Sequence, residues 1–298
     1  MKIIAAIVTY NRKELLKECI EALLEQTWQK FQIVVVDNAS TDGTKDTLKE
    51  YMSKDQIIYY NTGSNLGGAG GFNRAIRYAL DEKADYIWLM DDDTMPNKEA
   101  LEKMLFTAGK LSNQFGFLSG KVLWKDGKLC KMNEQKNYKL IKRIAPGEEI
   151  IRCKQATFVS FFVRASVVKE VGLPISDFFI WGDDVEYSRR ISGKYVSYYV
   201  PESCVVHKTA NNVGSNIARD EYSRISRYKF AYRNEMYIAR QEGLRRMIYQ
   251  IGKIFYHILK ILFLANGNRL EKMQIVIESS FNGIKFNPDI EYYGTENT

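Results

Sequence analysis

Alternation of short apolar runs with amphipathic helical patterns over the first ~125 residues constrains the fold of this chain more than any other feature. The apolar runs are rich in β-branched and aromatic residues, which is typical of strands buried on both faces of a parallel sheet. They occupy residues 3–10, 31–38, 56–61 and 86–91. The helical patterns between them are "KELLKECIEALLEQT", "TDGTKDTLKEYMSK" and "GGFNRAIRYALDEK". Strands that alternate with helices predict an α/β layered domain with right-handed crossovers.

The pattern changes twice after this region. Residues 115–208 are mixed: "FGFLSGKVLW", "ATFVSFFVR" and "YVSYYVP" predict strands, and "DDVEYSRRIS" predicts a short helix. From about residue 218 onward the pattern is helical. A polar, glycine-containing stretch, "TANNVGSN", separates the two parts, as linkers often do. We therefore predict an α/β domain over residues 1–212 and a helical region over residues 213–298.

Composition narrows the class of protein. With 45% hydrophobic and 27% charged residues, a chain of 298 residues can bury a large core and is neither disordered nor fibrous. The four cysteines lack CxxC spacing, which argues against a zinc site or a disulfide framework and indicates a reducing cytoplasm. The first apolar run is too short for a signal peptide, and no stretch approaches the ~20 apolar residues that span a bilayer. We therefore expect a cytoplasmic protein.

Positive charge is concentrated near the C-terminus. The whole chain carries +7, and residues 219–272 hold twelve Lys or Arg against five Asp or Glu, which is again +7. A basic, aromatic-rich segment suggests an anionic surface such as phospholipid headgroups or nucleic acid, with a solvated helical face as the alternative. Within it, "RRMIYQIGKIFYHILKILFLA" has the residue spacing of a helix that lies in the headgroup layer. A packing face against the α/β domain or a dimer partner explains this pattern equally well.

Polar residues follow each predicted strand of the first domain. Thr9 and Arg12 follow the first strand, Asp37 the second, residues 61–71 the third, and residues 91–93 the fourth. In open α/β sheets, ligands bind beyond the carboxyl ends of the strands. We therefore expect these four polar loops to converge on one binding site.

The acidic triplet Asp91–Asp93 is the most informative of these loops. Side chains two residues apart in an extended segment point the same way, so Asp91 and Asp93 can grip one ion while Asp92 faces elsewhere. Hard divalent cations such as Mg²⁺ and Mn²⁺ prefer carboxylate oxygens. One alternative is an acidic helix N-terminus. Another is the D-x-D-x-T motif of haloacid-dehalogenase-type phosphatases, but Thr94 stands one place early for that motif.

The glycine-rich segment "NLGGAGGFNRAI", residues 65–76, precedes a predicted helix. Glycines let the backbone approach a ligand closely, and helix N-termini favour phosphate. The segment is neither a Rossmann fingerprint nor a Walker loop, so on its own it indicates only a loop suited to an anion.

Two further segments carry candidate chemistry. In "FFIWGDDVEYSRRI", an aromatic run leads to Asp183 and Asp184 at a predicted helix start. A carboxylate beside aromatic surface can have its pKa raised toward that of a working general base. The alternative is an acidic cap, with Asp183 as N-cap and Glu186 at N3. His207 follows a strand, as a metal ligand could, although a lone histidine is more often structural; His257 is assigned no role.

Taken together, these segments resemble the inverting family 2 glycosyltransferases with the GT-A fold, a Rossmann-like mixed sheet flanked by helices, over roughly residues 1–210. "AIVTYNR" followed by "VVVDNASTDGT" is similar to the family's nucleotide-binding start, "WLMDDDT" to its metal site, and "WGDDVEYSRR" to its catalytic motif. "NLGGAGGFNRAI" resembles a segment of bacterial galactofuranosyltransferases. Their metal site adds a histidine about two dozen residues past the catalytic Asp, and His207 lies 23 residues after Asp184.

The resemblance implies a metal-dependent enzyme that moves galactofuranose from UDP-galactofuranose onto a hydroxyl of a lipid-linked, cell-surface glycan. The implied site residues are Thr9, Arg12, Asp37, Asn65, Gly68 and Asp92 for the nucleotide sugar, Asp91, Asp93 and His207 for Mn²⁺ or Mg²⁺, Asp184 as the base, and Trp181 and Asp183 for the acceptor. The chain is shorter than the polymerising members, so a single addition is implied. The implied location is the cytoplasm, peripheral on the inner face of the cell membrane.

Three alternatives are weighed against this interpretation. A rhamnosyltransferase using dTDP-rhamnose shares much of the pattern. A non-catalytic sugar-nucleotide-binding subunit would predict loss of Asp184 or of the acidic triplet, and both are present. A nucleic-acid partner would explain the basic segment but not the acidic edge of the sheet, so none is expected.

Overall fold

Four parallel strands form the N-terminal half of the sheet in the computed structural model, which describes residues 1–52, 56–136 and 151–294. They are β1 (Ile3–Thr9), β2 (Gln32–Asp37), β3 (Ile57–Asn61) and β4 (Tyr86–Asp91). Alternate residues of β1 enter two separate hydrophobic clusters, one on each face of the sheet. This two-sided burial is why these strands read as continuous apolar runs, and it confirms the predicted parallel sheet.

Within the described residues, five further strands extend the sheet beyond β4, paired antiparallel except for β6 and β9, which are parallel. Its order is β3-β2-β1-β4-β8-β6-β9-β5, and β7 also pairs with β9. The added strands are β5 (Thr94–Pro96), β6 (Phe117–Trp124), β7 (Ile151–Arg152), β8 (Phe161–Arg164) and β9 (Tyr198–His207). The strand predicted over residues 156–164 is shorter than expected, because Phe158–Ser160 forms the 3-10 helix η2. The mixed sheet explains how β9, far along the chain, reaches the edge where β4 ends.

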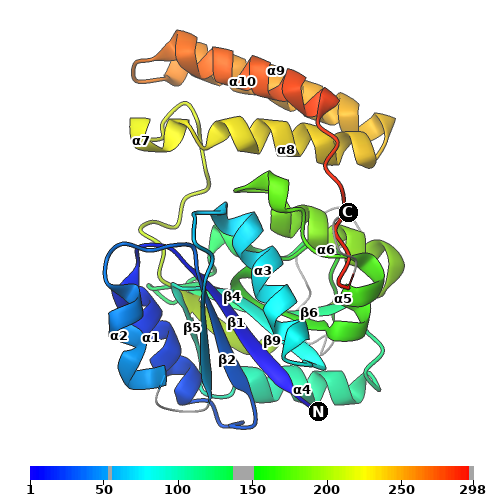
Figure 1. Ribbon diagram of the computed structural model, residues 1–298. Coiled ribbons are helices and arrows are strands. Elements are labelled where there is room, and N and C mark those ends of the chain that lie inside the picture. The colour runs from blue at the N-terminus through cyan, green and yellow to red at the C-terminus, as the bar shows by residue number, and fades with distance from the viewer. Residues whose placement is uncertain (53–55, 137–150, 295–298) are drawn as a thin grey trace.

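Helices cover both faces of the sheet (Figure 1). On one face lie α1 (Lys13–Leu24), α2 (Thr44–Met52) and α4 (Ala100–Lys110). On the other lie α3 (Gly67–Asp81), α5 (Ala165–Val171) and α6 (Asp183–Lys194). Two 3-10 turns, η1 (Lys131–Asn133) and η3 (Ser176–Phe178), lie in the loops at residues 125–136 and 172–182 and bear on the site described below.

The C-terminal helices form a layer beside the α/β domain (Figure 1). They are α7 (Tyr222–Ile225), α8 (Tyr228–Gln241), α9 (Leu244–Leu264) and α10 (Arg269–Lys285). A third hydrophobic cluster holds them together, and a fourth joins Tyr237 and Ile238 of α8 to Phe178 and Ala69 of the α/β domain. The helical layer therefore packs directly on the loop that precedes α6.

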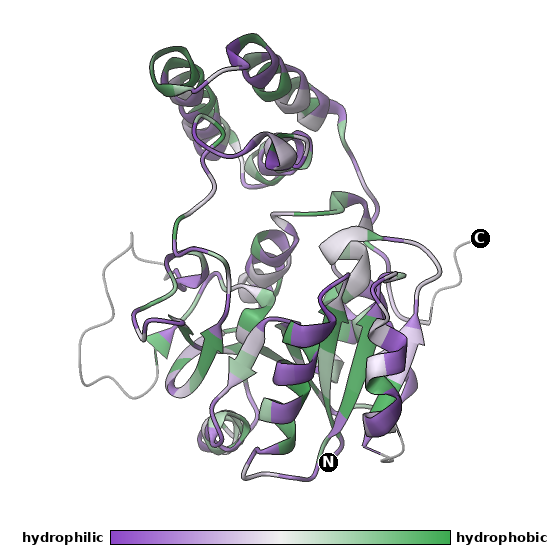
Figure 2. Cartoon of the chain, turned by 90° about the vertical axis from the view of Figure 1, so that its left-hand side faces the viewer, coloured by the Kyte–Doolittle hydropathy of each residue, from purple (hydrophilic) through white to green (hydrophobic). Residues whose placement is uncertain are grey.

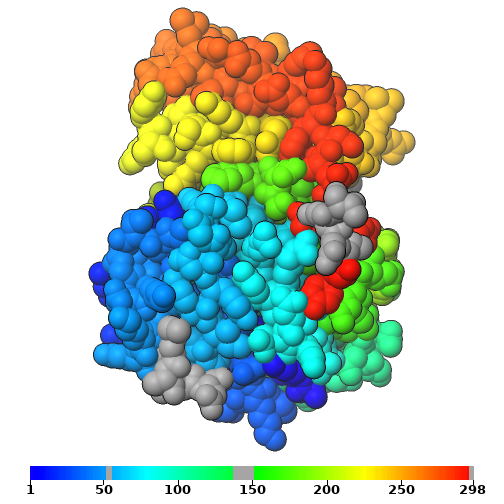
Figure 3. All heavy atoms as spheres, viewed as in Figure 1, coloured from blue at the N-terminus to red at the C-terminus, as the bar shows by residue number. Residues whose placement is uncertain are grey.

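The end of the chain contacts the α/β domain. After α10 the chain turns back and lies against the α/β domain (Figure 3). Leu173 N–H donates to the Glu291 carbonyl at 2.8 Å, and the Tyr293 hydroxyl donates to Asp81 at 3.0 Å. Arg77 forms an ion pair with the side chain of Glu291. The last described residues thus hold the helical layer and the sheet domain together.

Helix α9 contradicts the expectation that no segment approaches bilayer-spanning length. It has 21 residues and contains an 18-residue window of mean hydropathy 1.3, only 11% of which is buried in the molecule. Four cations interrupt the apolar residues of α9 in the sequence, so no uninterrupted apolar run of this length is present. The mean hydropathy of the helix is nevertheless high enough for a membrane helix. By length and composition alone, α9 is a candidate membrane helix.

Candidate active site

The carboxyl ends of the parallel strands meet at one edge of the sheet, as predicted. Thr9 pairs with Asp37, Asp37 pairs with Asn61, and Val8 pairs with Asp91 in the strand register. The loops after β1, β2, β3 and β4 therefore leave the sheet side by side. Residues separated by more than eighty positions in the sequence share one edge because the strands are parallel.

Asp91, Asp93 and His207 converge on one point. Strand β9 pairs antiparallel with β5, and this register sets His207 opposite Thr94, directly after the acidic triplet. The Nε2 atom of His207 lies 2.8 Å from Asp93 Oδ1 and 3.9 Å from Asp91 Oδ2. One ligand atom from each of the three residues lies within 4.8 Å of the others. The sequence pairs these residues only by resemblance, and the sheet topology brings them into contact distance.

Asn133 of η1 orients the His207 ring, and nothing in the sequence pointed to it. Its Oδ1 accepts a hydrogen bond from His207 Nδ1 at 2.8 Å, while its Nδ2 donates to Thr157 Oγ1 at 2.9 Å. The Cys130 thiol also donates to the same oxygen, at 3.0 Å. Because Nδ1 donates its hydrogen, Nε2 is the nitrogen that carries the lone pair when the ring is neutral, and it faces Asp91 and Asp93.

The charges at this point fit a divalent cation. Burial disfavours a charged imidazole, but the adjacent Asp93 carboxylate outweighs this and raises the pKa of His207 to about 10. Burial and the charge of Asp93 raise the pKa of Asp91 to about 7. Asp93 Oδ1 is buried and accepts no hydrogen bond of normal geometry, although it lies close to Nε2. Two carboxylates and an imidazole that face one point, with Asp91 partly exposed, are a donor set suited to Mn²⁺ or Mg²⁺.

The side chain of Asp92 is held by Thr9 and Arg12. Its Oδ2 accepts from Thr9 Oγ1 at 2.8 Å, and its Oδ1 from Arg12 Nη1 at 3.2 Å. The same Arg12 nitrogen lies 3.0 Å from Asp93 Oδ2. Burial raises the pKa of Asp92 to about 6. Thr9, Arg12 and Asp92, expected to face the nucleotide, form one hydrogen-bonded group against the acidic triplet.

Both carboxylate oxygens of Asp37, at the end of β2, accept a hydrogen bond from the protein. Its Oδ1 accepts from Ser40 N–H at 2.8 Å, and its Oδ2 accepts from the Tyr59 hydroxyl at 2.7 Å. Burial and Asp37 together raise the pKa of Tyr59 to about 12, so Tyr59 stays a donor. Each carboxylate oxygen can accept a second hydrogen bond, so Asp37 is oriented by these contacts and still able to bind a nucleotide edge.

The glycine-rich segment was expected to form a loop before a helix. Instead, its glycines lie in the first turns of α3 itself. Asn65 is exposed, and its Oδ1 accepts from Gly67 N–H at 2.8 Å. Gly67 has a φ of +71°, and an added Cβ would lie 2.1 Å from the Phe179 carbonyl oxygen. An added Cβ at Gly71 would meet Val8 and Asn38, whereas Gly68 has nothing within 4 Å. Most of these glycines therefore serve close packing of α3, and Gly68 alone fronts open space.

The loop before α6 has an unusual backbone that α8 secures. Phe179 and Trp181 have φ values of +59° and +65°, in the left-handed region that costs energy for residues other than glycine. The fully buried Asn234 of α8 donates through Nδ2 to the Phe178 carbonyl at 2.9 Å and the Trp181 carbonyl at 2.8 Å. The Phe179 carbonyl in turn accepts from Ala69 N–H of α3. The start of α6 is thus fixed from two sides.

Asp183 and Asp184 open helix α6, but the predicted cap is wrong. The N-cap is Gly182, with a φ of +91°, and Glu186 pairs with Arg190 instead of closing a capping box. A glycine occupies this position because glycine alone adopts the left-handed backbone conformation without strain. Asp183 is therefore the first helical residue and Asp184 the second.

The two carboxyls differ in exposure. Desolvation raises the pKa of the half-buried Asp184 to about 6, and Val185 N–H donates to its Oδ1 at 2.7 Å. Burial and the neighbouring Asp184 raise the pKa of Asp183 well above its usual range, and the charge of Asp91 contributes. Asp183 and Asp91 therefore lie near enough for their charges to interact. A carboxylate with a pKa of about 6 is suited to take a proton at neutral pH.

Trp181 packs against the helical layer. Its ring meets Tyr228 edge-on, with centroids 5.1 Å apart, and the Arg224 guanidinium lies 5.8 Å from the ring centre. Trp181 is only partly buried in this cluster, so part of its surface remains available beside Asp184. The C-terminal helices thus form one wall of the region in front of the candidate base.

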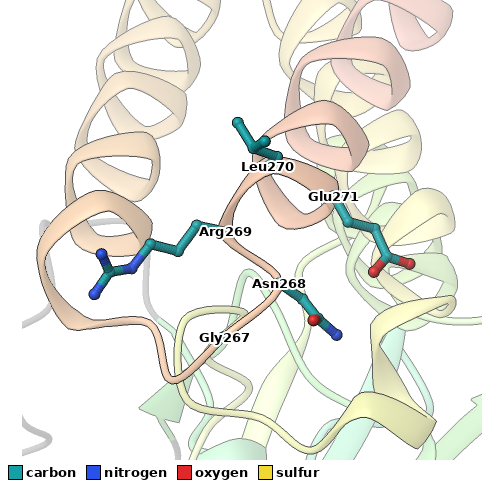
Figure 4. A pocket seen from close by; sticks show the side chains of 5 residues that line it. All are labelled: Gly267, Asn268, Arg269, Leu270 and Glu271. Atoms are coloured by element: carbon teal, nitrogen blue, oxygen red, sulfur yellow. The ribbon is translucent and has the colours of Figure 1, made fainter.

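A hollow elsewhere on the molecule is separate from these residues. It lies at the turn between α9 and α10 and is lined by Gly267, Asn268, Arg269, Leu270 and Glu271 (Figure 4). None of these belongs to the acidic cluster, to the α6 carboxyls or to the loops after β1–β4. The candidate chemistry is therefore placed at the sheet edge.

Comparison with known proteins agrees with this geometry. Residues 4–164 match the family model described as Glycosyl transferase family 2. Galactofuranosyltransferase GlfT1 of Mycobacterium tuberculosis is 29% identical over 271 residues, covering 83% of this chain and 85% of that protein. The GlfT1 of Mycolicibacterium smegmatis is 26% identical over 272 residues, with 83% and 85% coverage.

Solved structures share the fold. The Staphylococcus aureus protein TarS superposes with a TM-score of 0.57 at 18% identity, covering 96% of this chain and 44% of that one. Mannosyltransferase PcManGT from Pyrobaculum calidifontis, in complex with GDP-Man and Mn²⁺, gives 0.56 at 16% identity, covering 96% of this chain and 75% of that one. At these identities the likeness supports the GT-A fold alone. The family match spans more than half of the chain and includes the acidic triplet. The chain belongs to glycosyl transferase family 2, and the protein is a glycosyltransferase.

Proposed function

We propose that this enzyme transfers galactofuranose from UDP-galactofuranose to a hydroxyl of a glycan acceptor, with inversion at the anomeric carbon. The observation that carries the proposal is the similarity to GlfT1, which runs over 83% of the chain and so extends into the C-terminal helices. A relative named for another sugar, the poly(ribitol-phosphate) beta-glucosyltransferase of Bacillus spizizenii, matches only 34% of the chain.

The donor would bind along the carboxyl edge of the parallel strands, in the α/β domain of residues 1–212. Asp37 would bind the uracil edge through acceptor capacity that Ser40 and Tyr59 leave unused. Arg12 and Thr9 would share their hydrogen bonds between Asp92 and the nucleotide, and Asn65 and Gly68 would border the sugar and diphosphate.

Asp91, Asp93 and His207 would hold Mn²⁺ or Mg²⁺, with Asn133 keeping His207 in the ligating tautomer. When bound, such an ion supplies positive charge that stabilises the diphosphate as it departs. PcManGT, which shares the fold, has Mn²⁺ in its solved complex. The pKa of Asp91, raised by burial and Asp93, means that binding the ion would release protons near neutral pH.

Asp184 would act as the general base. The acceptor hydroxyl oxygen attacks the anomeric carbon, and its proton passes to the Asp184 carboxylate. The bond between the anomeric carbon and the diphosphate oxygen breaks at the same time, and its electron pair leaves with UDP. A single displacement of this kind inverts the configuration. Trp181, in the loop before α6, and Asp183, the first residue of α6, would position the acceptor.

A donor panel tests the proposal. Purified full-length enzyme is mixed with UDP-galactofuranose, UDP-galactopyranose, UDP-GlcNAc or dTDP-rhamnose, with Mn²⁺ and a glycan acceptor, and release of the nucleoside diphosphate is followed. We expect turnover with UDP-galactofuranose to exceed the others by about a hundredfold, because a pocket built to hydrogen-bond one sugar rejects others strongly. Preference for dTDP-rhamnose would replace the donor assignment and leave the family assignment intact.

A further inference from the structure

The outward face of α9 carries a continuous apolar stripe that no other part of the described chain covers. We propose that this face binds in the plane of an anionic lipid bilayer and docks the enzyme on a membrane surface. The outer α9 face comprises Leu244, Ile248, Ile251, Phe255, Leu259 and Phe263. These residues recur every three or four positions, so they share one side of the helix. Phe255 is 63% exposed and Phe263 is 77% exposed.

The opposite side of α9 is used for packing inside the molecule. Gln250 and Lys253 donate to the Glu235 carboxylate of α8 at 3.0 Å and 2.7 Å. Ile261 is fully buried, and His257 contacts the Tyr232 hydroxyl at 2.7 Å. The helix is therefore not a core helix with a few exposed residues. It has one docked side and one apolar side that faces outward (Figure 2).

The arrangement fits a helix lying in the membrane interface better than one crossing the bilayer. A crossing would break the contacts to Glu235 and carry four cations, Arg245, Arg246, Lys253 and Lys260, into hydrocarbon. In the plane of the interface, the stripe enters the acyl boundary and the contacts to α8 remain intact. Tyr249 and Tyr256, both exposed, flank the stripe at the depth that aromatic belts occupy.

Charge complementarity selects a lipid surface as the occupant. Helix α9 has no acidic residue, and two of its four cations are engaged inside the molecule: Lys253 pairs with Glu235, and Arg246 pairs with Glu242. The other two, Arg245 and Lys260, are the α9 charges that favour anionic headgroups. A further apolar side chain lies at the α9–α10 turn, where Leu270 is 80% exposed (Figure 4). A second copy of this chain fits less well. Self-association through this face would bring the basic helix of one copy against the same basic helix of the other, without acidic residues on α9 to pair them.

The test is co-sedimentation of the full-length protein with vesicles of phosphatidylcholine alone or of an equal mixture with phosphatidylglycerol. We expect binding to the mixed vesicles that weakens as salt rises. Replacing both aromatic residues, Phe255→Ser with Phe263→Ser, should lower the partition coefficient at least tenfold, as expected for removing two buried aromatic rings. The charge variant Arg245→Glu with Lys260→Glu should lower it by a similar factor on anionic vesicles only.

The matched control is Phe106→Ser. Phe106 is 62% exposed on α4, which covers the sheet domain, so this variant loses a comparable aromatic side chain outside α9. Its vesicle binding should equal that of the parent. Every variant is first checked for unchanged UDP binding, so that a loss of vesicle binding is not a loss of fold. Vesicle binding requires no turnover, so failure here and failure of the proposed donor chemistry are distinguishable.

Two results would overturn the proposal. One is parent protein that does not bind the mixed vesicles, or a Phe255→Ser, Phe263→Ser variant that binds them as well as the parent does. The other is analytical ultracentrifugation showing a dimer that this double variant dissociates, while vesicles do not compete with dimer formation. The second result would identify the outer α9 face as an interface between copies of the chain.

Discussion

Asn133 Oδ1 lies 2.8 Å from His207 Nδ1, and this contact determines which nitrogen of the ring faces the acidic cluster. The acceptor role of Oδ1 is secured because Asn133 Nδ2 donates to Thr157 and the Cys130 thiol also donates to Oδ1. An oxygen that accepts from Nδ1 leaves Nε2 for the cation. Asn133 is therefore a positioning residue for the metal site, acting through His207.

Replacing Asn133 should weaken metal binding without unfolding the protein. We expect Asn133→Ala to lower Mn²⁺ affinity by about 10–100-fold, the usual effect of removing a hydrogen bond that orients a ligating histidine. Mn²⁺ affinity is measured on the full-length protein by electron paramagnetic resonance, which needs no turnover. Asn133→Asp retains an acceptor oxygen and should retain most of the affinity. Equal Mn²⁺ affinity in Asn133→Ala and the parent would exclude the positioning role.

The contrast between His207 and Asn133 shows which site residues can be predicted from the sequence and which cannot. His207 could be predicted because a resemblance supplied both its spacing from Asp184 and the partner triplet. Asn133 could not, because its contact depends on how a 3-10 turn after β6 meets the end of β9, 74 residues later. The four strands of the parallel half were predicted almost to their ends, since burial on both faces leaves an unmistakable apolar run. No local pattern specifies a contact between two irregular segments.

Asp184 should give the reaction a defined pH dependence. A base must be ionised to accept a proton, and desolvation raises the pKa of Asp184 to about 6. The value of kcat/KM should therefore rise with pH through about 6 and level off above it. Titration of Asp91 near pH 7 would affect metal loading, so the profile is recorded at saturating Mn²⁺.

Removing the base itself should separate chemistry from binding. We expect Asp184→Asn to lower kcat by about 10²–10⁴-fold while UDP affinity, measured by calorimetry, stays within about twofold of the parent. The matched control is Asp177→Asn, which alters an exposed carboxyl in η3, seven positions earlier, and should keep both the rate and the pH profile. If the Asp184→Asn enzyme keeps a tenth of the parental rate, Asp184 is not the general base.

Gly67 should be intolerant of any side chain. Its φ of +71° is strained for other residues, and an added Cβ would lie 2.1 Å from the Phe179 carbonyl oxygen. We expect Gly67→Ala to lower the free energy of unfolding by about 2 kcal/mol or more, measured by urea denaturation. Displacing Phe179 would also shift the start of α6, so kcat should fall. Gly109→Ala in α4, where nothing lies within 4 Å, should leave stability equal or higher. Equal stability of Gly67→Ala and the parent would contradict the tight contact.

The glycine-rich segment also shows that one sequence pattern can serve two structural roles, ligand approach or close packing. The sequence predicted backbone near a ligand, and Gly68 remains compatible with that prediction. Gly67, Gly70 and Gly71 instead face protein atoms: Phe179, Leu66 and Val8, respectively. Either use requires the same residue type, because both need a missing Cβ. Only the packing of the loop before α6 against α3 distinguishes them, and that packing is set from outside by the C-terminal helices.

Asn234 makes this dependence testable. Its amide donates to the Phe178 and Trp181 carbonyls, which lie in the strained loop directly before Asp183 and Asp184. Asn234→Ala removes the amide donor from both carbonyls, although the Phe178 carbonyl still accepts from Ile180 N–H. The loss should lower the free energy of unfolding by about 1–3 kcal/mol. Because the loop sets the start of α6, which carries the candidate base, kcat should fall by about tenfold or more while KM for the donor changes less.

The control for Asn234 is Asn282→Ala, which alters an exposed asparagine of α10 in the same helical layer and should leave both constants unchanged. Steady-state kinetics are run well below the melting temperature of each variant, so that the folded fraction does not determine the rate. A purely structural role would lower stability yet leave kcat at the parental value under these conditions. A selective loss of kcat would instead mean that α8, in the helical layer, holds the base of the α/β domain in its working position.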